Sequence, residues 1–126
     1  MGDATKNFDY AEFSCHCCGK LCSDWKAGEV PQIILSVQKF RDLVGKPVQI
    51  LSGYRCPKHN AEVEGVRFSQ HLVGNAADVR VQGMSPAEMR SIAEKIPEFL
   101  HGGIGIYEAS DFTHLDVRGY RARWTG

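Results

Sequence analysis

The sequence lacks an excess of charge of either sign, and this bears on what the protein binds. Its 15 basic and 15 acidic residues cancel, so the formal net charge is +0 at pH 7. A neutral chain has no global field that draws it to nucleic acid or to an anionic membrane. The arginines of RGYRARW (residues 118–124) are locally dense, but on a tail we interpret them as a solvated face. We therefore expect no nucleic-acid partner.

Long apolar runs are missing too. No stretch approaches the roughly 20 residues needed to cross a bilayer, so we expect no membrane span. The first residues show no charged region followed by an apolar core, which is the pattern of a secretory signal. We expect synthesis in the cytoplasm, with release by another agent if the target lies outside the membrane.

Internal repeats, low-complexity tracts and long linkers are absent as well. We expect a chain of 126 residues to form one globular domain, which buries roughly two thirds of its extended surface on folding. Within it we expect a cysteine-rich N-terminal segment, residues 1–30, to pack on a domain formed by residues 31–126. We expect the protein to be a monomer.

Cysteine is present, but in an uneven pattern. Four of the five cysteines fall in CHCCGKLC (residues 15–22), whereas a secreted disulfide framework has an even, dispersed set. Three interpretations stay open: reduced thiols in a loop, a partial disulfide, or a second zinc site. The zinc site would draw on Cys15, Cys17, Cys18 and Cys22, with His16 beside them. Against it, Cys17 and Cys18 are adjacent and the spacing matches no standard zinc knuckle.

Apolar periodicity and capping residues predict a short series of helices and strands. Pro31 suits the first turn of a helix, Gly45 suits its end, and SPAE (residues 85–88) is a strong helix start. The expected elements are a helix over 31–44, a strand over 46–51, helical turns over 57–63, a loop over 65–70, a strand over 76–81, a helix over 85–96, and a hairpin over 102–107 and 112–117. This order indicates an α+β domain with a small, largely antiparallel sheet flanked by helices.

Two histidines and an aspartate carry the strongest functional signal. His71 and Asp78 stand seven residues apart in SQHLVGNAAD (residues 69–78), and His114 lies in FTHLDVR (residues 112–118). Two imidazoles and one carboxylate are the ligand set of a catalytic zinc that keeps a fourth position for water, whereas four protein ligands close a structural site. Magnesium and calcium are disfavoured because they prefer oxygen ligands. The set predicts a hydrolase in which zinc activates water.

Hydrolysis also requires a proton acceptor. Asp111, three residues before His114, is a candidate general base, although aspartate is also common in turns. Asp116 is a competing base. A carboxylate on the same strand face as a ligating histidine equally suits a role in orienting the ring. Glu108 is a more distant third candidate.

Substrate binding is expected at Arg55 and Ser69. A guanidinium grips a carboxylate or a polarised carbonyl oxygen with two parallel hydrogen bonds, which makes Arg55 the natural anion clamp. Ser69 is expected to add a hydrogen bond near the metal.

The motifs that carry these residues resemble a known family. SGYRCPKHN (52–60), SQHLVGNAAD (69–78), GGIGIY (102–107) and FTHLDVR (112–118) are similar to segments of the M15 peptidases, which include zinc D-Ala-D-Ala carboxypeptidases and phage L-alanyl-D-glutamate endopeptidases. The likeness covers roughly residues 30–118 and implies the fold shared with Hedgehog signalling domains. It implies zinc on His71, Asp78 and His114, substrate binding by Arg55, and a general base at Asp111. Many small members of this branch lack an obvious acid at that position, so the general base stays open between Asp111 and Asp116.

The sequence thus predicts a zinc metallopeptidase that cleaves a peptide bond in peptidoglycan stem peptides at the cell wall. A D-Ala-D-Ala carboxypeptidase is favoured over an L-Ala-D-Glu type endopeptidase, and a phage or prophage lysin would fit the missing signal. One alternative is a non-catalytic zinc module that binds cell-wall peptide or a protein partner. The other is a cysteine-cluster zinc protein for protein or nucleic-acid recognition, which the neutral charge disfavours.

Overall fold

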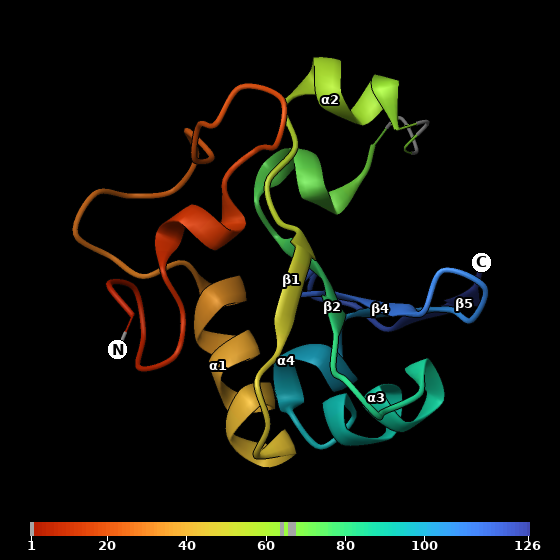
Figure 1. The fold of residues 1–126 in the computed structure, drawn as a ribbon. Helices are drawn as coiled ribbons and strands as arrows, with labels where there is room; N and C mark the ends of the chain where they lie inside the picture. The colour runs from red at the N-terminus through yellow and green to blue at the C-terminus, as the bar shows by residue number, and fades with distance from the viewer. Residues whose placement is uncertain (1, 64, 66–67) are drawn as a thin grey trace.

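The computed structural model describes residues 2–63, 65 and 68–126 of the chain (Figure 1). Its elements are the 3-10 helix η1 (Tyr10–Phe13), α1 (Gln32–Val44), β1 (Gln49–Ser52), α2 (Pro57–Glu62), the 3-10 helix η2 (Gln70–Val73), β2 (Ala76–Arg80), α3 (Pro86–Ala93), α4 (Pro97–Leu100), β3 (Gly103–Tyr107), β4 (Phe112–Asp116) and β5 (Ala122–Thr125). Part of the loop expected over residues 65–70 lies outside the described residues. In the described ranges, no helix combines the length and apolar character that a membrane crossing requires.

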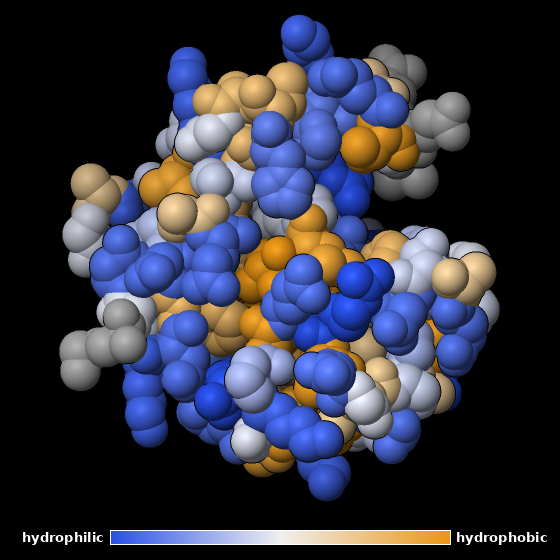
Figure 2. Space-filling model, viewed as in Figure 1, coloured by the Kyte–Doolittle hydropathy of each residue, from blue (hydrophilic) through white to orange (hydrophobic). Residues whose placement is uncertain are grey.

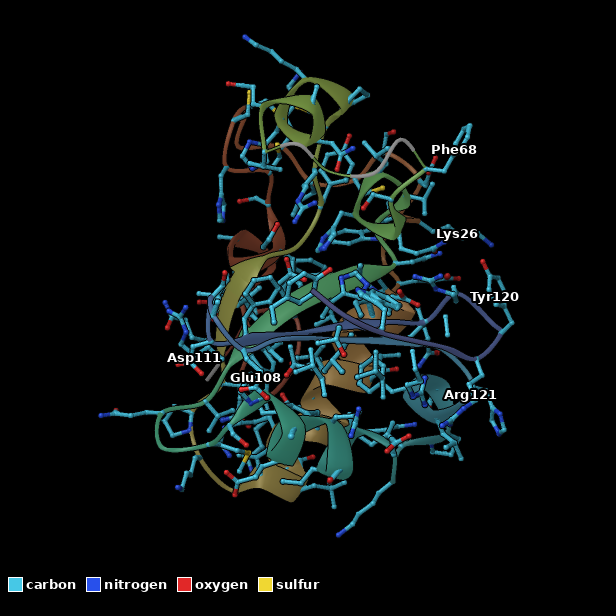
Figure 3. The ribbon with its side chains drawn as sticks, turned by 90° about the vertical axis from the view of Figure 1, so that its right-hand side faces the viewer. Lys26, Phe68, Glu108, Asp111, Tyr120 and Arg121 are labelled. Atoms are coloured by element: carbon cyan, nitrogen blue, oxygen red, sulfur yellow. The ribbon has the colours of Figure 1, made fainter. Side chains whose placement is uncertain are left out.

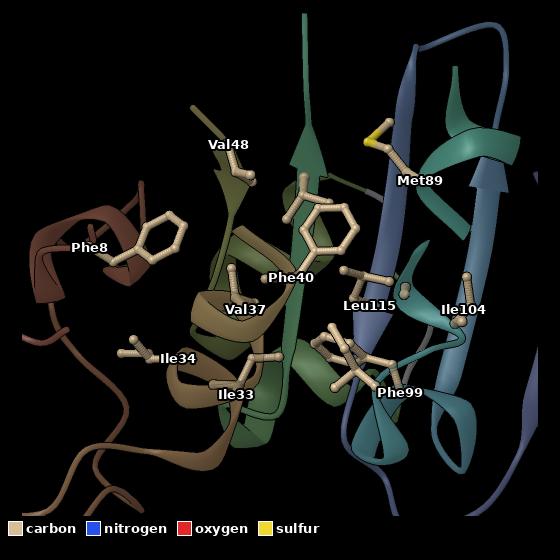
Figure 4. Packing of buried hydrophobic residues seen from close by; sticks show 14 of the residues in the cluster. Phe8, Ile33, Ile34, Val37, Phe40, Val48, Met89, Phe99, Ile104 and Leu115 are labelled. Atoms are coloured by element: carbon tan, nitrogen blue, oxygen red, sulfur yellow. The ribbon is translucent and has the colours of Figure 1, made fainter. Parts of the chain in front are cut away.

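The five strands form one sheet in the order β1-β2-β4-β3-β5. Neighbouring strands run antiparallel, except that β5 runs parallel to β3. Helices α1, α3 and α4 contact the strands through the apolar face of the sheet (Figure 4). The predicted α+β class with a largely antiparallel sheet is confirmed.

The hydrophobic core lies between these helices and the sheet. Val79, Ile104 and Leu115 enter it from three strands and pack with buried side chains of the helices. Phe8 and Phe13, from the N-terminal segment, belong to the same core and meet edge to face with ring centroids 5.8 Å apart. Residues before α1 therefore contribute to the core, and the boundary at residue 30 stays a prediction.

Helix α1 forms where the sequence predicts it. Pro31 is its N-cap, and Gly45 ends it with a φ of 71°, a left-handed conformation that glycine adopts without steric cost. The residues that it buries recur at helical spacing and are Ile33, Ile34, Ser36, Val37 and Phe40. The prediction of a helix over residues 31–44 is confirmed.

Helix α3 begins as predicted but ends earlier. Ser85 Oγ accepts the backbone N–H of Glu88 at 3.1 Å, and Glu88 Oε1 accepts the backbone N–H of Ser85 at 3.0 Å, which forms a capping box. The helix ends at Ala93, so the predicted end near residue 96 is wrong. Ile96 is extended (φ −102°, ψ 117°) because the ring of Pro97 disfavours a helical conformation at the residue before it.

Strand β5 corrects the interpretation of the C-terminal segment. It pairs with β3, so that Trp124 lies beside Gly105. The Arg123 guanidinium donates to Glu94 Oε2 at 3.2 Å and to backbone carbonyl oxygens at the end of α4. With its side chain 18% exposed, Arg123 is not part of a solvated basic face. The same holds for Arg118, whose side chain is also 18% exposed.

Candidate metal centre

The structure brings His71, Asp78 and His114 together from three elements. His71 lies in η2, Asp78 in β2 and His114 in β4, where Asp78 and His114 are direct cross-strand partners. One ligand atom from each lies within 4.8 Å of the other two, and all three residues are buried. Asp78 Oδ1 lies 3.2 Å from His71 Nε2 and 3.0 Å from His114 Nδ1. One carboxylate oxygen therefore faces both imidazoles.

The 3-10 helix η2 fixes the position of His71. Ser69 is its N-cap and accepts the backbone N–H of His71 at 3.2 Å, while Gly74 ends the turn in a left-handed conformation. On the ring, Nδ1 lies 2.7 Å from the Gly53 carbonyl oxygen. A carbonyl oxygen can only accept, so Nδ1 carries a hydrogen and Nε2 is the nitrogen that faces Asp78. Ser69 positions His71 in this structure, and its contact with a substrate stays a prediction.

Asp116 fixes the orientation of His114. Its Oδ2 lies 2.7 Å from His114 Nε2, and because a carboxylate only accepts, Nε2 carries the hydrogen and Nδ1 faces Asp78. Arg118 donates to the same Oδ2 at 2.7 Å, and the backbone N–H of Gly103 donates to Oδ1 at 2.8 Å. A Cβ atom at residue 103 would lie 2.3 Å from Oδ2, so a glycine there admits the carboxylate.

Burial and hydrogen bonding set the charges of the site. Burial lowers the pKa of His71 against the influence of Asp78. Burial also opposes protonation of His114, but its hydrogen bonds to Asp116 and Asp78 outweigh burial and raise its pKa. Burial would raise the pKa of both carboxyls. Despite this, His71 and His114 hold the pKa of Asp78 well below the usual range. In the same way, His114 and Arg118 hold the pKa of Asp116 well below the usual range. Two ionised carboxylates therefore stand among the imidazoles, which favours a cation.

Arg55 lies beside the three converging residues. It follows β1, and its guanidinium donates to Asp78 Oδ2 at 3.1 Å, to Ser52 Oγ at 3.1 Å and to Asn60 Oδ1 at 3.3 Å. The oxygen of Asp78 that it contacts is the one that does not face the imidazoles. The guanidinium and the candidate metal position are therefore linked through a single carboxylate.

A cleft of about 570 Å³ opens above these groups. Figure 2 shows the surface hollowed between the part of the molecule that carries α2 and the part that carries β4 and β5. The described residues that line the cleft are Arg55, Val63, Gly65, Phe68, Ser69, Gln70, His71, Asp78, Tyr107, Phe112, His114, Arg118, Tyr120 and Trp124. Asp78 is the acidic residue among them.

The sequence reasoning missed the aromatic lining of this cleft. Tyr107 and Phe112 stack with ring centroids 4.5 Å apart, and Trp124 Nε1 donates to the Tyr107 hydroxyl at 2.8 Å. The Trp124 ring also lies 5.1 Å from the ring of His114. The available signal is the alternation of apolar and polar residues in Ala-Arg-Trp-Thr (residues 122–125), which the sequence analysis interpreted as part of a solvated tail. Tyr120 lies in the turn before that strand (Figure 3).

Asp111 and Glu108 lie away from the cleft lining. Both belong to the turn between β3 and β4, at the end of the hairpin remote from Tyr120 (Figure 3). The Asp111 side chain is 60% exposed, with its carboxylate 3.6 Å from Arg80 Nε. Neither acid is among the described residues that line the cleft.

Comparison with known proteins identifies the family to which this chain belongs. The protein-family model described as Peptidase M15 matches residues 6–116. The peptidoglycan L,D-endopeptidase MepK of Escherichia coli (strain K12) is 30% identical over 105 residues, with 75% of this chain and 56% of the relative covered. The zinc D-Ala-D-Ala carboxypeptidase of Streptomyces albus G is 29% identical over 121 residues, with 86% of this chain and 45% of the relative covered. The chain thus spans about half the length of these curated relatives. Since the family model matches most of its residues, this protein belongs to the M15 peptidases.

Proposed function

We propose that this protein is a zinc-dependent peptidase that hydrolyses a peptide bond in peptidoglycan stem peptides. The observation that carries the proposal is the convergence of three buried donor groups, from His71, Asp78 and His114, beside a cleft. The substrate class is supported by relatives named as a peptidoglycan L,D-endopeptidase and a zinc D-Ala-D-Ala carboxypeptidase.

The donor set fits zinc in chemistry and in spacing. Other acceptors hold His71 Nδ1 and His114 Nε2, so His71 Nε2 and His114 Nδ1 are the nitrogens that face Asp78, at 3.2 and 3.0 Å from its Oδ1, and each would bind zinc in its deprotonated form. Ligand atoms around a tetrahedral zinc, at about 2.1 Å from the ion, are about 3.4 Å apart. We propose these three residues as the ligands. When bound, zinc lowers the pKa of a water toward about 7 and polarises a carbonyl oxygen.

Arg55 is proposed to hold the substrate. Its bonds to Asp78, Ser52 and Asn60 use one donor from each guanidinium nitrogen and fix the plane of the group at the cleft. A guanidinium has five N–H donors, so donors remain for a carboxylate or carbonyl oxygen of a stem peptide. The bound peptide would then lie against both the arginine and the metal position.

We propose that Asp116 is a positioning residue for His114. Both of its oxygens already accept hydrogen bonds, from Gly103, Arg118 and His114, and the carboxylate is fully buried. A base that takes a proton from water requires contact with that water. The role of Asp111 as general base remains a prediction, and it requires the carboxylate to leave Arg80 and turn toward His114.

The test is digestion of purified muropeptides by the zinc-loaded protein, with the products weighed by mass spectrometry. Release of D-alanine would identify a carboxypeptidase, and cleavage within the stem would identify an endopeptidase. His71→Ala and His114→Ala should abolish cleavage and lower the zinc content. His101→Ala removes an exposed histidine outside the cleft and is the matched control.

Two results would contradict the proposal. Full hydrolysis by a metal-free preparation would exclude a zinc-dependent reaction. Bound zinc and bound stem peptide without any product would instead favour the non-catalytic binding module.

A further inference from the structure

Three cysteine thiols form a second group, separate from the histidine centre. The sulfur atoms of Cys15, Cys18 and Cys56 all lie within 4.8 Å of one another. Cys56 comes from the segment that directly follows Arg55, not from the N-terminal cluster. Cys22, which the sequence groups with the cluster, is buried elsewhere, close to Gly74. Its sulfur is not one of this group of three, and its inclusion in a shared metal site stays a prediction.

The N-terminal half of this thiol cluster is a tight turn. Cys15 and Cys18 are separated by two residues and followed by Gly19, which has a φ of 72°. The backbone N–H of Gly19 donates to the Cys15 carbonyl oxygen at 2.7 Å, and the N–H of Cys15 donates to the Lys20 carbonyl oxygen at 2.9 Å. A Cys-x-x-Cys-Gly turn is a common half of a zinc site. The sequence reasoning missed it because Cys17 lies inside the turn.

Backbone N–H groups donate hydrogen bonds to two of the three sulfur atoms. Cys15 Sγ accepts the N–H of Cys56 at 3.4 Å, and Cys56 Sγ accepts the N–H of His59 at 3.4 Å. Hydrogen bonds of this kind stabilise thiolate, the form of cysteine that binds metal. The first of these hydrogen bonds links the N-terminal turn directly to the segment that carries Cys56.

We propose that Cys15, Cys18 and Cys56 hold a structural zinc ion, separate from the histidine centre. Sulfur atoms around a tetrahedral zinc, at about 2.3 Å from the ion, are about 3.8 Å apart, so small movements complete the geometry. Cys17, whose thiol interacts with that of Cys56, lies outside the group of three and would have to move to become a fourth ligand. A disulfide would use two of the sulfurs and leave the third without a role. Thiolates favour zinc over magnesium or calcium.

The ion would join the N-terminal segment to the loop that carries Arg55. The same two segments already meet where the Tyr54 N–H donates to the Phe13 carbonyl oxygen at 2.9 Å. In this loop, the Gly53 carbonyl oxygen holds the ring of His71. The thiol site itself does not depend on the proposed peptidase activity.

Metal analysis of the purified protein tests the site. Wild type should bind one zinc more per chain than Cys18→Ser or Cys56→Ser. Cobalt substitution gives a readout independent of activity, because cysteine ligands produce a near-ultraviolet thiolate-to-cobalt absorption band that histidine and aspartate ligands do not. That band should be present in wild type and in His114→Ala and absent from Cys18→Ser. Cys22→Ala is the matched control, since it removes a cysteine outside the thiol cluster, and it should keep the band.

Cys18 is exposed, so its replacement is expected to leave the fold intact, and circular dichroism checks this. Equal zinc content in wild type and Cys18→Ser, or no thiolate-to-cobalt band in folded wild type, would overturn the proposal. A disulfide between Cys15 and Cys56 in protein purified with reductant would overturn it too. A band retained in His114→Ala without any stem-peptide cleavage by wild type would support the thiol site and contradict only the peptidase.

Discussion

Asp116 decides which nitrogen of His114 faces the candidate metal position. An imidazole is a ligand only through a nitrogen without hydrogen, and the partner of the other nitrogen selects the tautomer. Here that partner is a carboxylate held by Arg118 and by the backbone of Gly103. For His71 a backbone carbonyl oxygen has the same effect. Each histidine is thus oriented by a different kind of acceptor.

The Asp116→Asn variant should bind zinc at the histidine centre about 10- to 100-fold more weakly. The asparagine amide can present its NH2 group to His114 Nε2, which favours the tautomer whose N–H points at Asp78. Competition with a chromogenic chelator measures the affinity. Asp111→Asn is the matched control and should leave zinc affinity unchanged. Wild-type zinc affinity in Asp116→Asn, together with lost turnover, would show that Asp116 acts on a proton of the reaction.

The Arg55→Lys variant should lower kcat/KM for stem peptide by about 10- to 100-fold, because a hydrogen bond to a charged group contributes about 1.5–3 kcal/mol. Lysine keeps the charge but loses the planar fork that binds two oxygens at once. Steady-state kinetics on a muropeptide measures the change. An unchanged kcat/KM would remove Arg55 from substrate binding.

At the scale of elements, local signals placed most helices and strands correctly. Helix α1 and the β3–β4 hairpin follow from apolar periodicity and alternation, because each buries one continuous face. Strand β5 was missed because it is only four residues long and its partner is β3, which is not adjacent to it in the chain. Its stability comes from a pairing across the sheet, to which single-segment patterns are blind.

The Ser85→Ala variant should lower the free energy of unfolding by about 1 kcal/mol, since it removes the N-cap of α3. Urea denaturation of the zinc-loaded protein measures the change. Ser91→Ala, on an exposed face of the same helix, is the matched control and should be close to neutral. Equal losses in both variants would mean that the capping box contributes nothing specific.

At the scale of the whole molecule, the N-terminal segment is an integral part of the core. The aromatic residues Phe8 and Phe13 of this segment are both buried. The three candidate zinc ligands were visible as a motif, and the structure gathers them, although their role stays a prediction. The meeting of Cys15 with Cys56 was not predictable, because it depends on how this segment packs beside the loop after β1.

The Phe13→Ala variant should lower the free energy of unfolding by about 3–5 kcal/mol, the usual range for a large aromatic side chain removed from a core. Its side chain is 0% exposed, whereas that of Phe68 is 83% exposed, so Phe68→Ala is a matched control with little expected effect. Chemical denaturation compares the two variants. Similar stabilities would show that the N-terminal segment is dispensable for folding.

Before a metal binds, each carboxylate at the histidine centre is paired with a guanidinium. Asp78 pairs with Arg55, and Asp116 pairs with Arg118, so the two carboxylates offset the two guanidiniums. A divalent cation held there would leave its full charge uncompensated at the cleft. Such a local field accelerates the encounter with anionic peptides, and dissolved salt screens it over about 10 Å at 0.1 M. We expect kcat/KM for stem peptides, which carry several carboxylates, to fall as ionic strength rises, even though the protein as a whole is uncharged.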